Sequence, residues 1–117
     1  KYDEDIYLAF VDSFDFLPLA ATVTTDDETK KYFCCHGGLS PQLRKIEDIN
    51  QLDRRVEPPP NGLLCDLLWA DPMSEQDTKE MNFTELAAWG KLKFRHNMAR
   101  GCSYEFGRAA VEFFLAE

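Results

Sequence analysis

The chain has 117 residues with a hydrophobic fraction of 44%, so its length predicts one domain with a modest core and its composition excludes disorder throughout. Lys and Arg number 13 against 21 Asp and Glu, and the resulting net charge of −8 argues against nucleic acid as the main partner. No apolar run approaches the roughly 18 residues of a membrane-spanning helix, and the acidic start does not fit a signal peptide. We therefore expect a cytoplasmic protein without a membrane contact.

The first third of the chain predicts a helix followed by a β-hairpin. Apolar residues recur every three or four positions over 4–16, as in an amphipathic helix, and Pro18 ends the pattern. Segments 19–24 and 32–35 are apolar or β-branched and predict two strands. The polar, charged segment 25–31 between them predicts a hairpin turn.

The rest of the chain carries weaker patterns. Ser40-Pro41 is typical of an N-cap followed by proline at the first helical position, and a short helix is expected near Ile46. Residues 73–93 show no clear pattern. The remaining expected elements are a proline-rich extended loop at 57–62, an apolar segment at 63–69, a loop at 97–101, a strand at 102–106 and a helix at 107–117. The predicted order is helix, strand, strand, helix, strand, strand, helix, which assigns a strand to 63–69 and indicates an α+β fold.

Four cysteines bear on the compartment and on metal binding. Cys34 and Cys35 are adjacent and would point to opposite faces of a strand, and no CxxC pair occurs. We expect free thiols in a reducing compartment. A zinc site built from these two cysteines with His36, Cys65 and Cys102 is the alternative.

A few residues could carry chemistry, and each has a plainer interpretation. His36 ends a strand before two glycines, which suits a metal ligand or a proton shuttle, or a histidine held by local hydrogen bonds. Arg100, beside a glycine, offers a planar fork of donors for phosphate or carboxylate, or is a surface arginine. Asp71 precedes a proline and is typical of a turn, and Trp69 belongs to the core or to the rim of a site.

Taken together, several segments resemble the phosphoprotein phosphatase family of serine/threonine phosphatases. In order, they are FDFLPLAA at 14–21, CHGGLSP at 35–41, LDR at 52–54, CDLLWADP at 65–72 and RGCSYEFG at 100–107. The resemblance covers nearly the whole chain, and the second and fourth strings are highly specific. The segment FRHN at 94–97, followed by RGCSY, is most similar to the calcineurin branch of the family.

The resemblance implies a hydrolase with two divalent metal ions, iron with zinc or manganese, that share a bridging water. In this family that water attacks the phosphorus of phosphoserine or phosphothreonine. His36 matches a metal ligand, and Arg100 matches an arginine that grips the substrate phosphate. Asp71 matches a structural aspartate of the catalytic site, and Trp69 matches an aromatic residue near the substrate groove.

The other sequence motifs of the family are absent from the chain. It contains no GDxHG, GDxxDRG or GNHE and only two histidines. We therefore expect residues 1–117 to be a middle-to-C-terminal fragment of a catalytic domain, truncated at both ends. Such a fragment would hold part of a sandwich of mixed sheets flanked by helices. It would be inactive alone and bind no metal tightly, because one imidazole cannot hold two ions.

The resemblance also implies partners. The full-length protein would act on phosphoproteins and bind a calcineurin-B-like regulatory subunit and calmodulin. The fragment would leave apolar surface where missing strands should pack, so we expect it to self-associate. The alternative function is a non-catalytic binding module that kept the fold and lost the chemistry.

Overall fold

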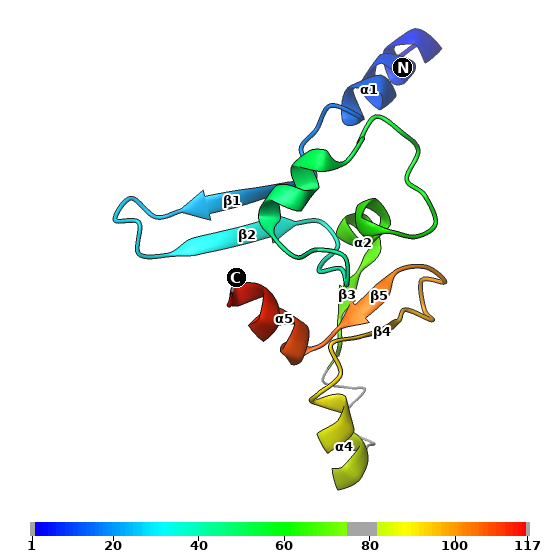
Figure 1. Ribbon diagram of the computed structural model, residues 1–117. Helices are drawn as coiled ribbons and strands as arrows, with labels where there is room; N and C mark the ends of the chain where they lie inside the picture. The colour runs from blue at the N-terminus through cyan, green and yellow to red at the C-terminus, as the bar shows by residue number, and fades with distance from the viewer. Residues whose placement is uncertain (1, 75–81, 117) are drawn as a thin grey trace.

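The computed structural model describes residues 2–74 and 82–116, which form two small sheets with helices around them (Figure 1). The helices are α1 (Glu4–Phe14), the 3-10 helix η1 (Ile46–Gln51), α2 (Leu63–Trp69), α4 (Phe83–Trp89) and α5 (Arg108–Leu115). The strands are β1 (Ala20–Thr24), β2 (Lys31–Cys35), β3 (Asp71–Pro72), β4 (Phe94–His96) and β5 (Tyr104–Phe106). This mixture of helices and sheets confirms the predicted α+β class.

The two sheets differ in how they are connected. β1 and β2 form the predicted antiparallel hairpin, with Ala20 opposite Cys35 and Thr24 opposite Lys31. The second sheet has the order β3-β5-β4, in which β3 is parallel to β5 and β4 is antiparallel to it. Its strands are only two or three residues long. The main effect of this sheet is therefore to bring together the segments that adjoin β3, β4 and β5.

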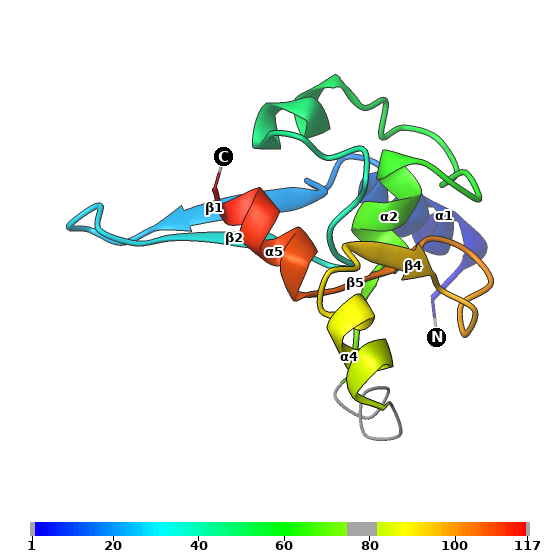
Figure 2. The same cartoon turned by 60° about the horizontal axis from the view of Figure 1, so that its bottom comes forward.

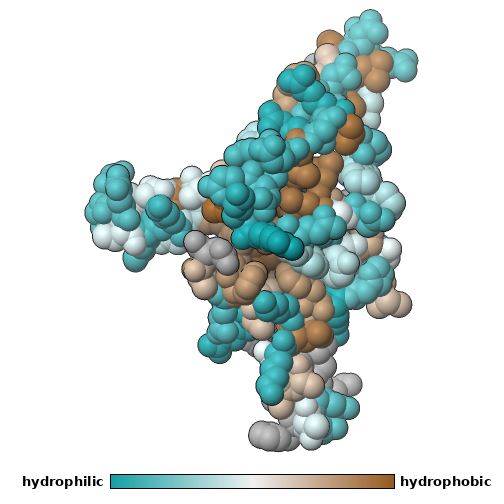
Figure 3. Space-filling model, viewed as in Figure 1, coloured by the Kyte–Doolittle hydropathy of each residue, from teal (hydrophilic) through white to brown (hydrophobic). Residues whose placement is uncertain are grey.

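Helix α1 forms where it was predicted but ends at Phe14, two positions before the predicted end. Asp3 caps it, because its Oδ1 accepts the backbone N–H of Ile6 at 3.0 Å. All of its residues are described and none is buried. Its apolar side chains, such as Phe10 at 63% exposure, face solvent, and Figure 3 shows brown apolar surface along this helix. The amphipathic pattern of α1 therefore has no partner within the described chain.

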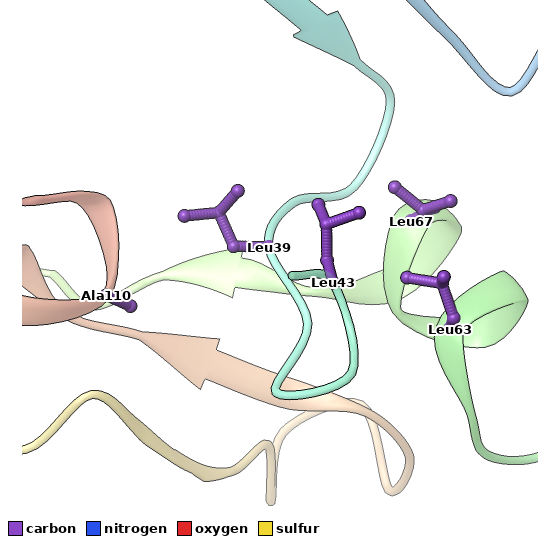
Figure 4. Close-up of a cluster of buried hydrophobic side chains, with 5 residues drawn as sticks. All are labelled: Leu39, Leu43, Leu63, Leu67 and Ala110. Atoms are coloured by element: carbon purple, nitrogen blue, oxygen red, sulfur yellow. The ribbon is translucent and has the colours of Figure 1, made fainter. Parts of the chain in front are cut away.

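The core lies between the loop that follows β2, helix α2 and the start of α5 (Figure 4). Its buried side chains are Leu39, Leu43, Leu63, Leu67 and Ala110. Segment 63–69 is a helix, so its assignment as a strand is wrong. Five consecutive residues, Leu63–Leu67, are buried, and a short run buried on all sides carries no periodicity that separates a helix from a strand.

A second correction concerns Ser40-Pro41, which starts a turn and no helix. The backbone N–H of Leu43 donates to the carbonyl of Ser40 at 3.1 Å, which closes a single turn. The Ser40 hydroxyl accepts the backbone N–H of Gln42 as a cap would, and it also donates to Asp66 at 2.6 Å. The long-range contact with Asp66 anchors the turn in the core.

Two elements of the structure have no counterpart in the sequence prediction. Strand β4 was not predicted, and α4 lies in the stretch 73–93, which shows no clear pattern.

Three parts of the molecule extend away from its centre, namely α1, the β1–β2 hairpin and α4 (Figures 1 and 2). The radius of gyration is 17.2 Å. A compact domain of this length would have about 13 Å. The small core and the extended shape leave much apolar surface exposed.

Within the described residues, no helix is long and apolar enough to cross a membrane.

Candidate active site

The four residues singled out from the sequence line one open pocket of about 290 Å³. His36 comes from the end of β2, Trp69 from the end of α2, Asp71 from β3 and Arg100 from the loop between β4 and β5. His36, the segment with Trp69 and Asp71, and Arg100 follow one another about 30 positions apart in the sequence. The second sheet brings Asp71 and the Arg100 loop together, because β3 and β4 both pair with β5.

Asp71 and Arg100 form a two-bond ion pair. Arg100 Nε donates to Asp71 Oδ2 at 2.9 Å, and Arg100 Nη2 donates to Asp71 Oδ1 at 3.2 Å. The hydrogen bond from Arg100 lowers the pKa of Asp71, and burial opposes it. The pair uses two of the five N–H groups of the guanidinium, so three remain to bind an oxyanion.

Trp69 completes the surroundings of the guanidinium. The Arg100 guanidinium carbon lies 5.9 Å from the centre of the Trp69 ring, within the range of a cation–π contact. Trp69 is 45% exposed, so the structure places it on the rim of the pocket and outside the core. The aromatic ring thus borders the guanidinium at the mouth of the pocket.

Asn97 was missed by the sequence analysis, which assigned 97–101 only as a loop. It is 1% exposed. Its Nδ2 donates to Asp71 Oδ2 at 2.8 Å, and its Oδ1 accepts the backbone N–H of Arg100 at 3.1 Å. Asparagine before a turn is a recognised signal for such a side-chain-to-backbone bond. The sequence does not contain the contact with Asp71, which lies 26 positions away.

Buried Asp66 ties two loops of the site to α2. It is 0% exposed, and its carboxylate accepts hydrogen bonds from Ser40 Oγ at 2.6 Å and Ser103 Oγ at 2.7 Å. Ser40 follows the His36 loop, and Ser103 follows the Arg100 loop. A buried polar group is costly without hydrogen bonds, and each of the two Asp66 side-chain oxygens accepts one from a serine hydroxyl. The carboxylate therefore fixes how the two loops lie relative to each other.

The glycine after His36 allows the backbone to approach α2 closely. Gly37 N–H donates to the carbonyl of Leu67 at 2.7 Å. A Cβ at Gly37 would lie 2.6 Å from the backbone of Leu68 and Trp69, which is a collision. The backbone at Gly37 is thus in direct contact with α2, and this contact holds His36 at the pocket that Trp69 also lines.

The cysteines are free thiols, as expected. Burial raises the pKa of the Cys65 thiol to about 11, and the nearby Cys102 adds to the rise. Among residues 2–74 and 82–116, no three His, Cys, Asp or Glu side chains lie close enough to hold a metal ion. The five zinc ligands considered above are all described, so the structure does not assemble them into a site.

The same finding limits the metal centre implied for His36. The His36 side chain is exposed at the pocket. Asp71 is the acidic residue that lines the pocket with it, and its carboxylate is already bonded to Arg100 and Asn97. A divalent ion bound by protein needs about three or four ligands. The described residues therefore offer one imidazole and do not by themselves fit a metal centre.

The chain is similar to known proteins over its whole length. Residues 1–117 match the family model described as calcineurin-like phosphoesterase. The chain is 42% identical over 132 aligned residues to the serine/threonine-protein phosphatase 2B catalytic subunit A2 of Saccharomyces cerevisiae, covering 100% of this chain and 21% of that protein. It is 41% identical over 121 residues to catalytic subunit A1 of the same yeast, covering 99% of this chain and 20% of that protein. The chain thus spans about a fifth of the length of these relatives.

Proposed function

Because this chain belongs to the calcineurin-like phosphoesterase family, we propose that it forms part of the catalytic domain of a metal-dependent serine/threonine protein phosphatase. Its share of the work is to bind the phosphate group of a phosphoserine or phosphothreonine. The observation that carries the proposal is the pocket in which Arg100, held by Asp71 and flanked by Trp69, lies with His36. Both relatives are named as catalytic subunits, which favours a phosphatase over a non-catalytic binding module.

In this proposal Arg100 binds the phosphate oxygens. Its guanidinium is fixed in direction by the two bonds to Asp71, so little side-chain freedom is lost when the phosphate binds. Its remaining N–H groups match oxygens that gain negative charge as the ester bond breaks. Asp71 is a positioning residue because it touches Arg100, and Trp69 borders the guanidinium on the rim of the pocket.

His36 is proposed as one ligand of the metal centre. A pair of divalent ions, iron with zinc or manganese, would supply an activated water and charge neutralisation at phosphorus. The described residues hold no complete centre, so the other ligands must come from outside them. We accordingly propose that residues 1–117 are a middle-to-C-terminal part of the domain and are inactive alone.

The longer protein proposed here would act on phosphoproteins in the cytoplasm. A calcineurin-B-like regulatory subunit and calmodulin are its proposed partners, by analogy with the phosphatase 2B relatives. Neither nucleic acid nor a membrane is a proposed partner, in keeping with the net charge of −8. The isolated chain is proposed to associate with itself.

Replacement of Arg100 tests the proposal. In the full-length phosphatase, Arg100→Ala is expected to lower kcat/KM for a phosphopeptide by about 100-fold or more, because a charge-assisted, two-pronged contact to the transferring group is lost. The matched control is Arg108→Ala. Arg108 is exposed, pairs with Glu112 on α5 and does not line the pocket.

Steady-state kinetics with added manganese give the comparison. An Arg100→Ala enzyme within twofold of wild type would overturn the phosphate-binding role. Turnover by the isolated chain that disappears on His36→Ala would contradict its proposed inactivity.

A further inference from the structure

Asn97 is a buried residue whose side-chain amide touches both members of the Asp71–Arg100 pair. Its side chain donates to the carboxylate of Asp71 and accepts the backbone N–H of Arg100, at 2.8 and 3.1 Å. Its backbone N–H donates to the carbonyl of Ser103 at 3.1 Å, and its carbonyl accepts Gly101 N–H at 3.0 Å. Every hydrogen-bonding part of Asn97 is therefore directed at the loop that carries Arg100 or at its acidic partner.

These contacts act on Arg100 from two sides. The bond to the Arg100 backbone closes the turn and sets where the arginine side chain begins. The bond to Asp71 Oδ2 leaves that oxygen shared by Asn97 and Arg100 Nε, which fixes the plane of the carboxylate. A carboxylate held in this way presents both oxygens to the guanidinium, and so the guanidinium has one favoured orientation.

The chemistry of an amide suits this task. A lysine or arginine in its place would add a second cation to Asp71 and compete with Arg100 for it. An aspartate would repel Asp71. Asparagine supplies one donor and one acceptor without charge, so it can bind Asp71 and the Arg100 backbone at once.

We infer that Asn97 is a positioning residue for phosphate binding, which sets the orientation of Arg100 through Asp71 and through the turn at 97–100. This rests on the proposed function, because it assumes that Arg100 binds the phosphate. Asn97 itself does not line the pocket and is not expected to touch the substrate.

A double-mutant cycle in the full-length phosphatase tests the inference, with p-nitrophenyl phosphate as the substrate. Misplacement of a catalytic group by about 1 Å costs up to 100-fold, so Asn97→Ala is expected to lower kcat/KM by about 10-fold or more. If Asn97 acts through Arg100, then Asn97→Ala added to Arg100→Ala has no further effect beyond about twofold. A purely structural role would instead multiply the two losses.

A further Asn97 variant tests the bond to Asp71, and a variant at Asn82 serves as the control. Asn97→Asp keeps the acceptor for the Arg100 backbone but replaces the donor to Asp71 by a repelling carboxylate, so it is expected to lower kcat/KM at least as far as Asn97→Ala does. Activity within twofold of wild type would overturn the inference. The control is Asn82→Ala, since Asn82 also closes a turn, by accepting the backbone N–H groups of Thr84 and Glu85 at 3.0 Å each, away from the pocket. It is expected to leave kcat/KM unchanged.

The outcomes separate the inference from the function on which it rests. An active wild type that loses activity in Arg100→Ala but keeps it in Asn97→Ala overturns the role of Asn97 alone. Losses that multiply in the double variant overturn it as well. Full activity of Arg100→Ala overturns the proposed function and the inference with it. Should Asn97→Ala fail to fold, Asn97→Ser takes its place in the same cycle.

Discussion

At the scale of single residues, the molecule depends on buried polar groups that connect distant loops. Asp66 is the clearest case, because its carboxylate is fully buried and accepts hydrogen bonds from the hydroxyls of Ser40 and Ser103. Within the described residues, no buried side-chain nitrogen or oxygen lacks a hydrogen-bond partner. The loops that carry His36 and Arg100 are therefore joined through one carboxylate.

Replacement of this carboxylate should cost more stability than its size suggests. Asp66→Ala is expected to lower the free energy of unfolding by about 3 kcal/mol, since two buried hydroxyls lose their acceptor. The matched control is Asp48→Ala, whose carboxylate accepts the backbone N–H groups of Arg44 and Lys45 at 3.1 Å near the surface. Urea denaturation would measure both, and equal losses in the two variants would contradict the role of Asp66.

At the scale of elements, the β1–β2 hairpin holds itself together through its turn. Asp27 Oδ1 accepts hydrogen bonds from Thr25 Oγ1 at 2.5 Å and from Thr29 Oγ1 at 2.9 Å. Glu28, at the tip, adopts a φ of 57°, a left-handed conformation that a non-glycine residue rarely takes. At this acidic tip, one carboxylate oxygen of Asp27 thus joins the threonines on both sides of the turn.

Acidification should loosen this turn. The hydrogen bond from Thr25, followed by those from Thr29, lowers the pKa of Asp27 below its value in the unfolded chain, which is about 3.9. A lowered pKa contributes stability above the unfolded value, and that stability is lost as pH falls through the folded value. We expect the amide signals of Thr29 and Lys30 to move toward disordered positions below about pH 4. In Asp27→Asn this acid step should be absent, and an identical titration in both proteins would refute the link.

At the scale of the whole molecule, the chain exposes more apolar surface than a small core can balance. Figure 3 shows apolar residues exposed along α1 and in the middle of the same face. On α1, Phe10 and Phe14 are 63% and 58% exposed. Contiguous apolar surface of this kind marks a contact with another chain or with another part of the same protein.

Self-association of the isolated chain should follow from this surface. We expect light scattering to give a mass above that of one chain at high concentration, and Phe10→Glu with Phe14→Glu to restore a monomer by adding charge to the apolar face of α1. Met98→Glu is the control, because Met98 is 82% exposed but lies on a loop away from that helix. A monomeric wild type at high concentration would contradict the expectation.

Local sequence was sufficient for elements whose pattern is set by near neighbours. The capped amphipathic helix α1 and the hairpin at 20–35 form with nearly the predicted bounds, because spacing, proline and turn residues act within a few positions. The sequence pattern also singles out a histidine before two glycines and an arginine beside a glycine, and the structure places His36 and Arg100 at one pocket. The family resemblance was carried by strings of the same local kind, and the family match over residues 1–117 confirms it.

Only the tertiary structure decided features that depend on contacts across the chain. Segment 63–69 is a helix whose first five residues are buried, and a run buried on all sides carries no periodicity that separates a helix from a strand. Ser40 begins a single turn, which its hydroxyl anchors in the core through the bond to Asp66. The pairing of Asp71 with Arg100, and the place of Asn97 behind both, depend on hydrogen bonds over 26 to 29 positions. Such contacts have no local signature, whereas the length, charge and residue chemistry of the chain are properties of the sequence itself.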